Sequence, residues 1–163
     1  MAVSAMPLTP SSFRPWGEVM LPLALALLIA VPQEGQPLPM KEGGFCTGIS
    51  WITATETAGW SQDIGPDFSV YRYDGPDKTW FGIYGGNASQ VSGSTGETLF
   101  VRDGVTVRSA IVDGQFRGYL ATDKRGWQNH FFGSVFTNTP QDRAFFDRVD
   151  FGPAGLEKCQ KYQ

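Results

Sequence analysis

Four residues in the second half of the chain have side chains that could together bind a ligand: Arg108, Arg117, Tyr119 and His130. Arginine supplies a fixed positive charge, and histidine is a donor whose charge changes near neutral pH. Tyrosine adds an apolar ring with a polar edge. If strands bring these residues to one face of a sheet, they predict a surface that binds an anionic or polar group. The alternative is an outer sheet face that is solvated or partly covered by a helix.

The sequence offers less support for catalysis. His130 is the only histidine, so a nucleophile with a histidine base would need a hydroxyl beside it. Ser109 is expected on the opposite face, Ser134 lies two residues further along the same strand, and no Gly-x-Ser-x-Gly motif occurs. An acidic pair would have to come from aspartates that flank expected turns, where Asp commonly bonds its own backbone. These are Asp63, Asp67, Asp74 and Asp77. We therefore expect a non-catalytic binding or interaction domain without a cofactor, and a small exported hydrolase that uses His130 or an acidic pair is the alternative.

Residues 98–136 must position the four candidate binding residues. Two pairs, Asp103-Gly104 and Asp113-Gly114, separate runs of alternating apolar residues. An Asp-Gly pair in this setting is the strongest local signal for a two-residue hairpin turn. A four-residue loop, 123–126, is expected to follow. These turns predict a four-stranded antiparallel meander.

The turns also predict which side chains share a face, because side chains alternate along a strand. Pairing of Phe100 with Val107, and of Arg108 with Tyr119, would place Arg108, Tyr119 and His130 in one cross-strand row. The opposite face would be the core face, and it would hold Phe100, Val105, Val107, Ile111, Phe116, Leu120, Asn129 and Phe131. A single β-bulge at Gly118 or Gly126 would shift the pairing by one residue and break the row.

A further hairpin and one helix complete the predicted fold. Residues 67–87 read as two β-type runs around the turn Asp-Gly-Pro-Asp. Residues 85–96, rich in glycine and serine, read as a connector, with a ligand flap as the alternative. The helix is expected from Pro140 to about Val149, because Thr139 suits the N-cap and Asp142 the third position, and Gly152-Pro153 is expected to end it. The predicted class is α+β, mainly antiparallel β, with the meander 98–136, the hairpin 67–87 and one C-terminal helix at about 140–149.

Two cysteines, Cys46 and Cys159, stand near opposite ends of the expected domain. In an exported protein this arrangement predicts one disulfide that closes almost the whole fold into a loop. Two unpaired buried thiols are the alternative. Two cysteines and one histidine at these spacings do not match a zinc module, so no metal site is expected.

Residues 1–30 read as a targeting segment rather than as part of the fold. The apolar run 19–31 is short for a membrane span of about 20 residues and suits the apolar region of a signal peptide, with an uncleaved membrane anchor as the alternative. Residues 31–44 read as a linker, and 45–163 as a single disulfide-closed β-rich domain. We therefore expect an exported protein, periplasmic or extracellular, and a membrane-tethered accessory protein is the other possibility.

Charge and composition exclude some partners. From Pro37 onward the chain has 12 Lys and Arg against 14 Asp and Glu, a net charge near −2, with both signs interspersed. This balance does not favour nucleic acid, or a membrane contact other than the N-terminal segment. A small molecule, peptide or protein remains as the expected partner. Trp51, Trp60, Trp80 and Trp127 could stack on a sugar or peptide, although tryptophans in a small β domain are more often core or turn anchors.

Two short motifs carry a resemblance. DFSVY at residues 67–71 followed by FGIYGGN at 81–87 resembles a pattern in small, exported, uncharacterised bacterial proteins. The resemblance covers about twenty residues. It implies export and a compact domain, and it assigns no catalytic or binding residue.

Overall fold

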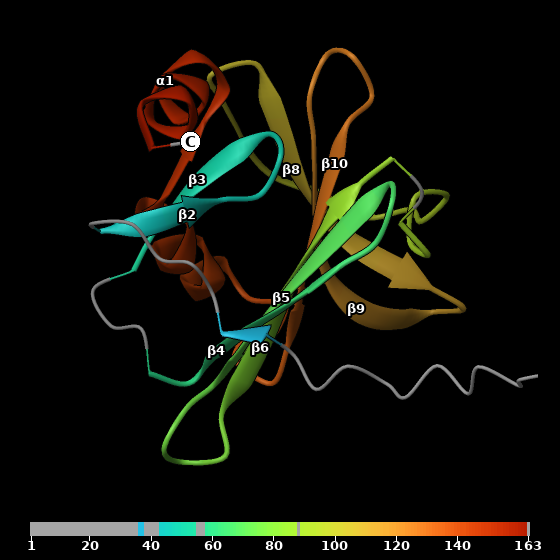
Figure 1. The fold of residues 1–163 in the computed structure, drawn as a ribbon. Coiled ribbons are helices and arrows are strands. Elements are labelled where there is room, and N and C mark those ends of the chain that lie inside the picture. Colours follow the sequence, from blue (N-terminus) through green and yellow to red (C-terminus); the bar gives the residue numbers. More distant parts are fainter. Residues whose placement is uncertain (1–35, 38–42, 55–57, 88, 163) are drawn as a thin grey trace, which may run out of the picture. The chain divides into compact units, whose positions relative to one another are not determined.

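The computed structural model describes residues 36–37, 43–54, 58–87 and 89–162 (Figure 1). The chain divides into two units, 1–32 and 33–163, and every described residue belongs to the second. The predicted targeting segment, 1–30, and most of the predicted linker, 31–44, lie outside the described residues. Within that linker the structure describes the short strand β1 and the start of β2.

Two antiparallel sheets make up the described domain. The larger has eight strands, in spatial order β1 (Gln36–Pro37), β4 (Trp60–Ile64), β5 (Phe68–Asp74), β6 (Trp80–Gly86), β10 (Gln128–Gly133), β9 (Gln115–Thr122), β8 (Val105–Val112) and β7 (Thr98–Arg102). The smaller has three, in the order β11 (Val149–Phe151), β3 (Ser50–Thr53) and β2 (Gly44–Cys46). The prediction of a mainly antiparallel β fold is confirmed. The predicted four-stranded meander is only part of the larger sheet. Its last strand, β10, also pairs with β6, and this pairing joins the predicted hairpin to the same sheet.

Both Asp-Gly turns form as predicted. Asp103 and Gly104 have φ of 52° and 80°, and Asp113 and Gly114 have 51° and 73°. Positive φ at both central positions is what a type I′ turn requires. Arg102 consequently pairs with Val105, and Phe100 with Val107, in the predicted register.

A β-bulge at Gly118 inverts the far half of β9. Ile111 pairs with Phe116 as predicted, but Ser109 pairs with Tyr119, so β9 has one residue more than β8 between these two pairs. Gly118 has a φ of 108°, and a Cβ there would lie 2.0 Å from the carbonyl oxygen of Phe131. Only glycine fits such a position. The bulge turns Tyr119 toward the core and Leu120 away from it, so the predicted faces of these two residues were wrong.

The loop after β9 restores the predicted face on β10. It has five residues, 123–127, because Thr122 pairs with Gln128 and not with Trp127. The Asp123 carboxylate accepts the backbone N–H groups of Arg125 and Trp127, at 2.8 and 2.9 Å, and so stabilises the longer loop. The bulge at Gly118 and the extra loop residue each shift the register by one residue, so together they leave the predicted faces of β10 unchanged. Asn129 and Phe131 lie on the core face as expected, and both are at most 1% exposed.

The main core lies on the face of the large sheet that carries Tyr119 and Phe131, and the small sheet and the helix η1 (Pro140–Arg148) contribute to the same cluster. Its aromatic members are Phe45, Tyr71, Phe100, Tyr119, Phe131, Phe136, Phe146 and Phe151. On the opposite face, a second cluster joins Val91 with Ala110 and Leu120. Val91 covers part of this face, and further along the same segment Thr95 and Glu97 pair with the edge of β8, through a bridge to Ile111 and a hydrogen bond from the N–H of Ser109 to the Glu97 carbonyl. The described part of the glycine- and serine-rich connector thus packs on the sheet.

The C-terminal region differs from the prediction in its helices. Residues 140–148 form the 3-10 helix η1, and the α-helix is α1 (Gly152–Tyr162), which the sequence interpretation missed. Gly152-Pro153 was expected to end a helix but begins one. Proline suits the first helical turn because its missing N–H has no partner there in any case. None of the described helices is long and apolar enough to cross a membrane.

The predicted disulfide is present. Cys46 on β2 and Cys159 on α1 are joined by an S–S bond of 2.02 Å, across 113 residues of sequence. It ties α1 to the small sheet at the position immediately before the turn 47–49.

Candidate functional site

The structure does not bring the four predicted binding residues together. Arg108 and His130 share the outer face of the large sheet, but the register places Leu120 between them. Arg117 lies in the bulge, where its guanidinium donates to Gln115 at 2.6 Å. Tyr119 is only 2% exposed and points into the core. The predicted cross-strand row was therefore wrong, for the reason foreseen at Gly118.

Tyr119 instead takes part in a buried structural contact. Its hydroxyl donates to Asp142 Oδ2 at 2.9 Å. The same oxygen accepts the N–H groups of Thr137 and Asn138, both at 2.9 Å. Burial and the hydrogen bond to Asp142 raise the pKa of Tyr119 well above its ordinary value. The pair holds the segment before η1 against the sheet and has no access to a ligand.

His130 is held by the backbone. Its Nε2 lies 2.7 Å from the carbonyl oxygen of Arg117, and its ring packs against Phe132 at 5.0 Å between centroids. Because a carbonyl only accepts, Nε2 must carry the proton. Burial lowers the pKa of His130 below its ordinary value of 6.5. This bond orients the ring and leaves Nδ1 as its unprotonated nitrogen, and no hydroxyl or carboxylate among the described residues bonds to it.

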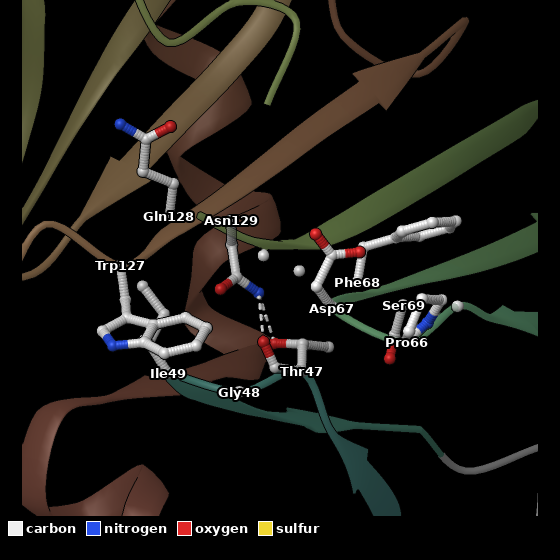
Figure 2. Close-up of a pocket in the computed structure, with 13 residues that line it drawn as sticks. Thr47, Gly48, Ile49, Pro66, Asp67, Phe68, Ser69, Trp127, Gln128 and Asn129 are labelled. Atoms are coloured by element: carbon white, nitrogen blue, oxygen red, sulfur yellow. Dashed lines mark hydrogen bonds between the residues drawn. The ribbon is translucent and has the colours of Figure 1, made fainter. Parts of the chain in front are cut away.

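A different site lies where the small sheet meets one end of the large one. The turn 47–49 between β2 and β3 faces residues 65–69 at the start of β5, residues 85–86 at the end of β6, and residues 127–129 at the start of β10. Together they line a hollow of about 300 Å³, which we call the Asn129 groove. Figure 2 labels residues from three of these segments, 47–49, 66–69 and 127–129, and shows the Asn129 side chain pointing toward Thr47. A volume of this size is at the lower end of the range for small-molecule sites.

The central polar residue of the groove is Asn129, which is 1% exposed. Its Nδ2 donates to the carbonyl oxygen of Thr47 at 3.0 Å and also contacts the Thr47 hydroxyl (Figure 2). Since the Thr47 carbonyl only accepts, this contact assigns the amide nitrogen to that side. Asn129 Oδ1 is buried and has no hydrogen-bond partner among the described residues. A buried oxygen without a partner costs about 1–3 kcal/mol, so a bound donor would recover that free energy.

The Thr47 turn is held close to the sheet by local features. The Thr47 N–H and hydroxyl both bond to Ser50, with N–H to carbonyl at 2.9 Å and hydroxyl to hydroxyl at 2.6 Å. On β6, a Cβ at Gly85 would lie 2.7 Å from the Thr47 carbonyl. Glycine at 85 therefore permits the approach that Asn129 needs. The disulfide at Cys46 anchors the residue before the turn.

Two exposed aromatic side chains stand at the edge of the groove. Trp127 is 43% exposed and Phe68 37%, which is unusual for side chains of this size in the described domain. In Figure 2 the side chains of Asn129 and Asp67 are drawn between those of Trp127 and Phe68. The groove thus combines ring surfaces, a carboxylate and a buried amide oxygen. Such a mixture of apolar walls and a few convergent polar groups is typical of ligand sites.

The sequence interpretation missed this site, although it contained one signal. Asn129 was placed on the core face, and a polar residue at a core position requires a partner or a function. Its partner, Thr47, is 82 residues away in the sequence, and no local pattern connects the two.

Among the described residues, no group of three or more His, Cys, Asp or Glu could hold a metal ion.

Comparison with known proteins identifies no relative. No protein-family model, curated protein or solved structure matches the chain. The assignment of function therefore depends on the site itself.

Proposed function

We propose that this chain is an exported, non-catalytic binding domain whose small-molecule ligand occupies the Asn129 groove. The observation that carries the proposal is that Asn129 lines a groove with exposed rings, while its Oδ1 is buried and has no hydrogen-bond partner among the described residues. A ligand that donates a hydrogen bond to this oxygen would satisfy it, and the rings of Trp127 and Phe68 would cover the ligand's apolar part.

Export is supported by the disulfide between Cys46 and Cys159. Structural disulfides form and persist in oxidising compartments and are rare where thiols are kept reduced. An intact-mass measurement of the natural product tests this part of the proposal: loss of the residues before the domain is expected, together with a mass lower by two hydrogen atoms than that of the reduced chain. Free thiols in the freshly isolated protein would contradict it.

The contact made by His130 supports binding over the alternative of a small hydrolase. Its Nε2 donates to the Arg117 carbonyl at 2.7 Å, and neither ring nitrogen bonds to a hydroxyl or carboxylate among the described residues. The outer face with Arg108 is also less suited to a ligand than the groove, because Leu120 between Arg108 and His130 is completely buried beneath the covering segment.

The test is an NMR titration of the isotope-labelled domain with small amides, polyols, sugars and amines at millimolar concentration. We expect shifts to cluster at the side-chain amide of Asn129 and at the backbone of Gly85 and Trp127. Trp127→Ala should weaken the binding of every hit, because it removes an exposed ring wall. Val101→Ala is the matched control, since Val101 is an exposed apolar residue (64%) on the edge strand β7. Shifts that cluster around Arg108 and are insensitive to Trp127→Ala would refute the proposal.

A further inference from the structure

We infer that the Asn129 groove selects a primary ammonium group that is attached to a small apolar group, such as a free amine or the first residue of a peptide. This inference rests on the proposed function, and it adds the charge and the donor pattern of the ligand. Three independent properties of the groove lead to it.

The first property is charge. Among the residues that line the groove, Asp67 is the only one with an ionisable side chain, and no Lys, Arg or His is present. Asp67 forms no ion pair with any residue in the described part of the chain, whereas Asp74, Asp123 and Asp150 each pair with a basic side chain. An anionic ligand would meet a carboxylate with no cation to balance it. A cationic ligand would find its counter-ion in place.

The second property is the direction of the available hydrogen bonds. Asn129 Oδ1 is a buried acceptor without a partner among the described residues. The Asp67 carboxylate is a further acceptor. The donor Nδ2 of Asn129 is already bound to Thr47. The free polar atoms of the groove are therefore acceptors, which a ligand can satisfy only with hydrogen-bond donors. An ammonium group carries three donors and no acceptor. A sugar hydroxyl both donates and accepts, so it matches this pattern less well.

The third property is the aromatic rim. Trp127 and Phe68 expose 43% and 37% of their surface beside Asp67 and Asn129 in the same lining. The face of an aromatic ring attracts a cation, most strongly for tryptophan. The same rings provide apolar surface for the group that carries the ammonium. A neutral ligand would gain only the second of these two contributions.

A titration with four probes tests the inference, with intrinsic tryptophan fluorescence and NMR shifts as readouts. The probes are phenethylammonium, phenylalanine amide, phenethyl alcohol and methyl glucoside. We expect the two ammonium probes to bind about tenfold or more tightly than the alcohol at low salt, and the advantage to shrink as salt screens the carboxylate. A preference for phenylalanine amide over phenethylammonium would identify a peptide N-terminus as the source of the ammonium, and the reverse a free amine.

Variants at two exposed aspartates supply the control. Asp67→Asn should weaken the ammonium probes by about threefold to tenfold and leave phenethyl alcohol unchanged, because it removes charge and keeps shape. Asp77→Asn, at an exposed aspartate in the turn between β5 and β6, should change neither. NMR spectra and melting temperatures of both variants show whether the fold is intact.

The outcomes separate the inference from the proposed function. If methyl glucoside or the alcohol binds as tightly as the amines while shifting Asn129, the groove is a binding site and the ammonium inference is wrong. If Asp67→Asn weakens charged and neutral probes alike, charge recognition by Asp67 is likewise refuted. If no probe shifts the groove residues at millimolar concentration, both the inference and the proposed function fail.

Discussion

Replacing Tyr119 by phenylalanine should destabilise the domain by about 1.5–3 kcal/mol. The substitution keeps the buried ring, which packs edge-on against Phe146 and Phe136 at 5.6 Å, and removes only the hydroxyl. The lost hydrogen bond goes to a buried carboxylate, Asp142, at 2.9 Å, and bonds to charged groups contribute about 1.5–3 kcal/mol. Asp142 retains its backbone donors from Thr137 and Asn138, so the cost should not exceed this range.

The measurement is urea-induced unfolding, with the free energy of unfolding taken at constant m value. The matched control is Tyr73→Phe, since the Tyr73 hydroxyl makes no hydrogen bond to any residue that the structure describes, and its ring contact with Trp60 at 5.2 Å is kept. That control should change stability by less than about 0.5 kcal/mol. A double-mutant cycle with Asp142→Ala isolates the pairwise contribution, expected to be about 1 kcal/mol or more.

The pH dependence gives a second readout of the same pair. Burial, assisted by Asp142, raises the pKa of Tyr119 above the ordinary value of 10.0. The folded state therefore holds this proton more tightly than the unfolded chain, so the contribution is complete below about pH 10 and declines as the pH rises further. Tyr119→Phe should flatten that decline. A variant as stable as the parent, with the same alkaline profile, would mean that the Tyr119–Asp142 contact does not stabilise the fold.

Two further predictions concern the disulfide and His130. Replacing both Cys46 and Cys159 by alanine should cost about 3–5 kcal/mol in urea unfolding, because the bond closes 113 residues and the chain-entropy model gives ~4.7 kcal/mol for a loop of about 100; an unchanged urea midpoint would contradict this. Burial lowers the pKa of His130 below 6.5, so the unfolded chain binds the proton more tightly and stability should fall as the pH drops below about 6.5. His130→Gln should reduce that fall, and an identical acid profile in the variant would show that His130 is not responsible.

Local turn chemistry explains what could be predicted from the sequence. The turns at Asp103-Gly104 and Asp113-Gly114 depend only on residues that tolerate positive φ between alternating apolar runs, and both form with the expected pairing. The disulfide was predictable because the chain has only two cysteines. Its formation also requires the folded chain to bring the two Cα atoms to 5.5 Å, which the sequence does not show.

Turn chemistry could not predict which side chains of β9 face the core. Whether Gly118 bulges depends on the carbonyl of Phe131 on the neighbouring strand, which occupies the space a side chain would need. The same applies to the loop 123–127, whose fifth residue is accepted because Asp123 bonds the N–H of Trp127. Each event shifts the register by one residue, and period-two alternation converts such a shift into a change of face. Arg108 and Tyr119 were separated in this way.

The C-terminal helices were likewise predictable only in part. Thr139, Pro140 and Asp142 correctly indicated a helical turn, and η1 begins where they predict. Its 3-10 geometry, and the α-helix that follows Gly152-Pro153, were not predicted. The chain past Gly152 has a short apolar pattern, and α1 is positioned by the small sheet and by the bond from Cys159 to Cys46.

By itself the sequence determined the β-rich class, the hairpin turns and the cystine, because each depends on residues close in the chain or on an unambiguous pair. Only the tertiary structure decided the site. The Asn129 groove joins four segments, and its central contact spans 82 residues between Asn129 and Thr47. The buried amide of Asn129 has an unpaired oxygen because packing pairs its nitrogen with Thr47 and brings no donor to Oδ1, and that arrangement has no counterpart in sequence order.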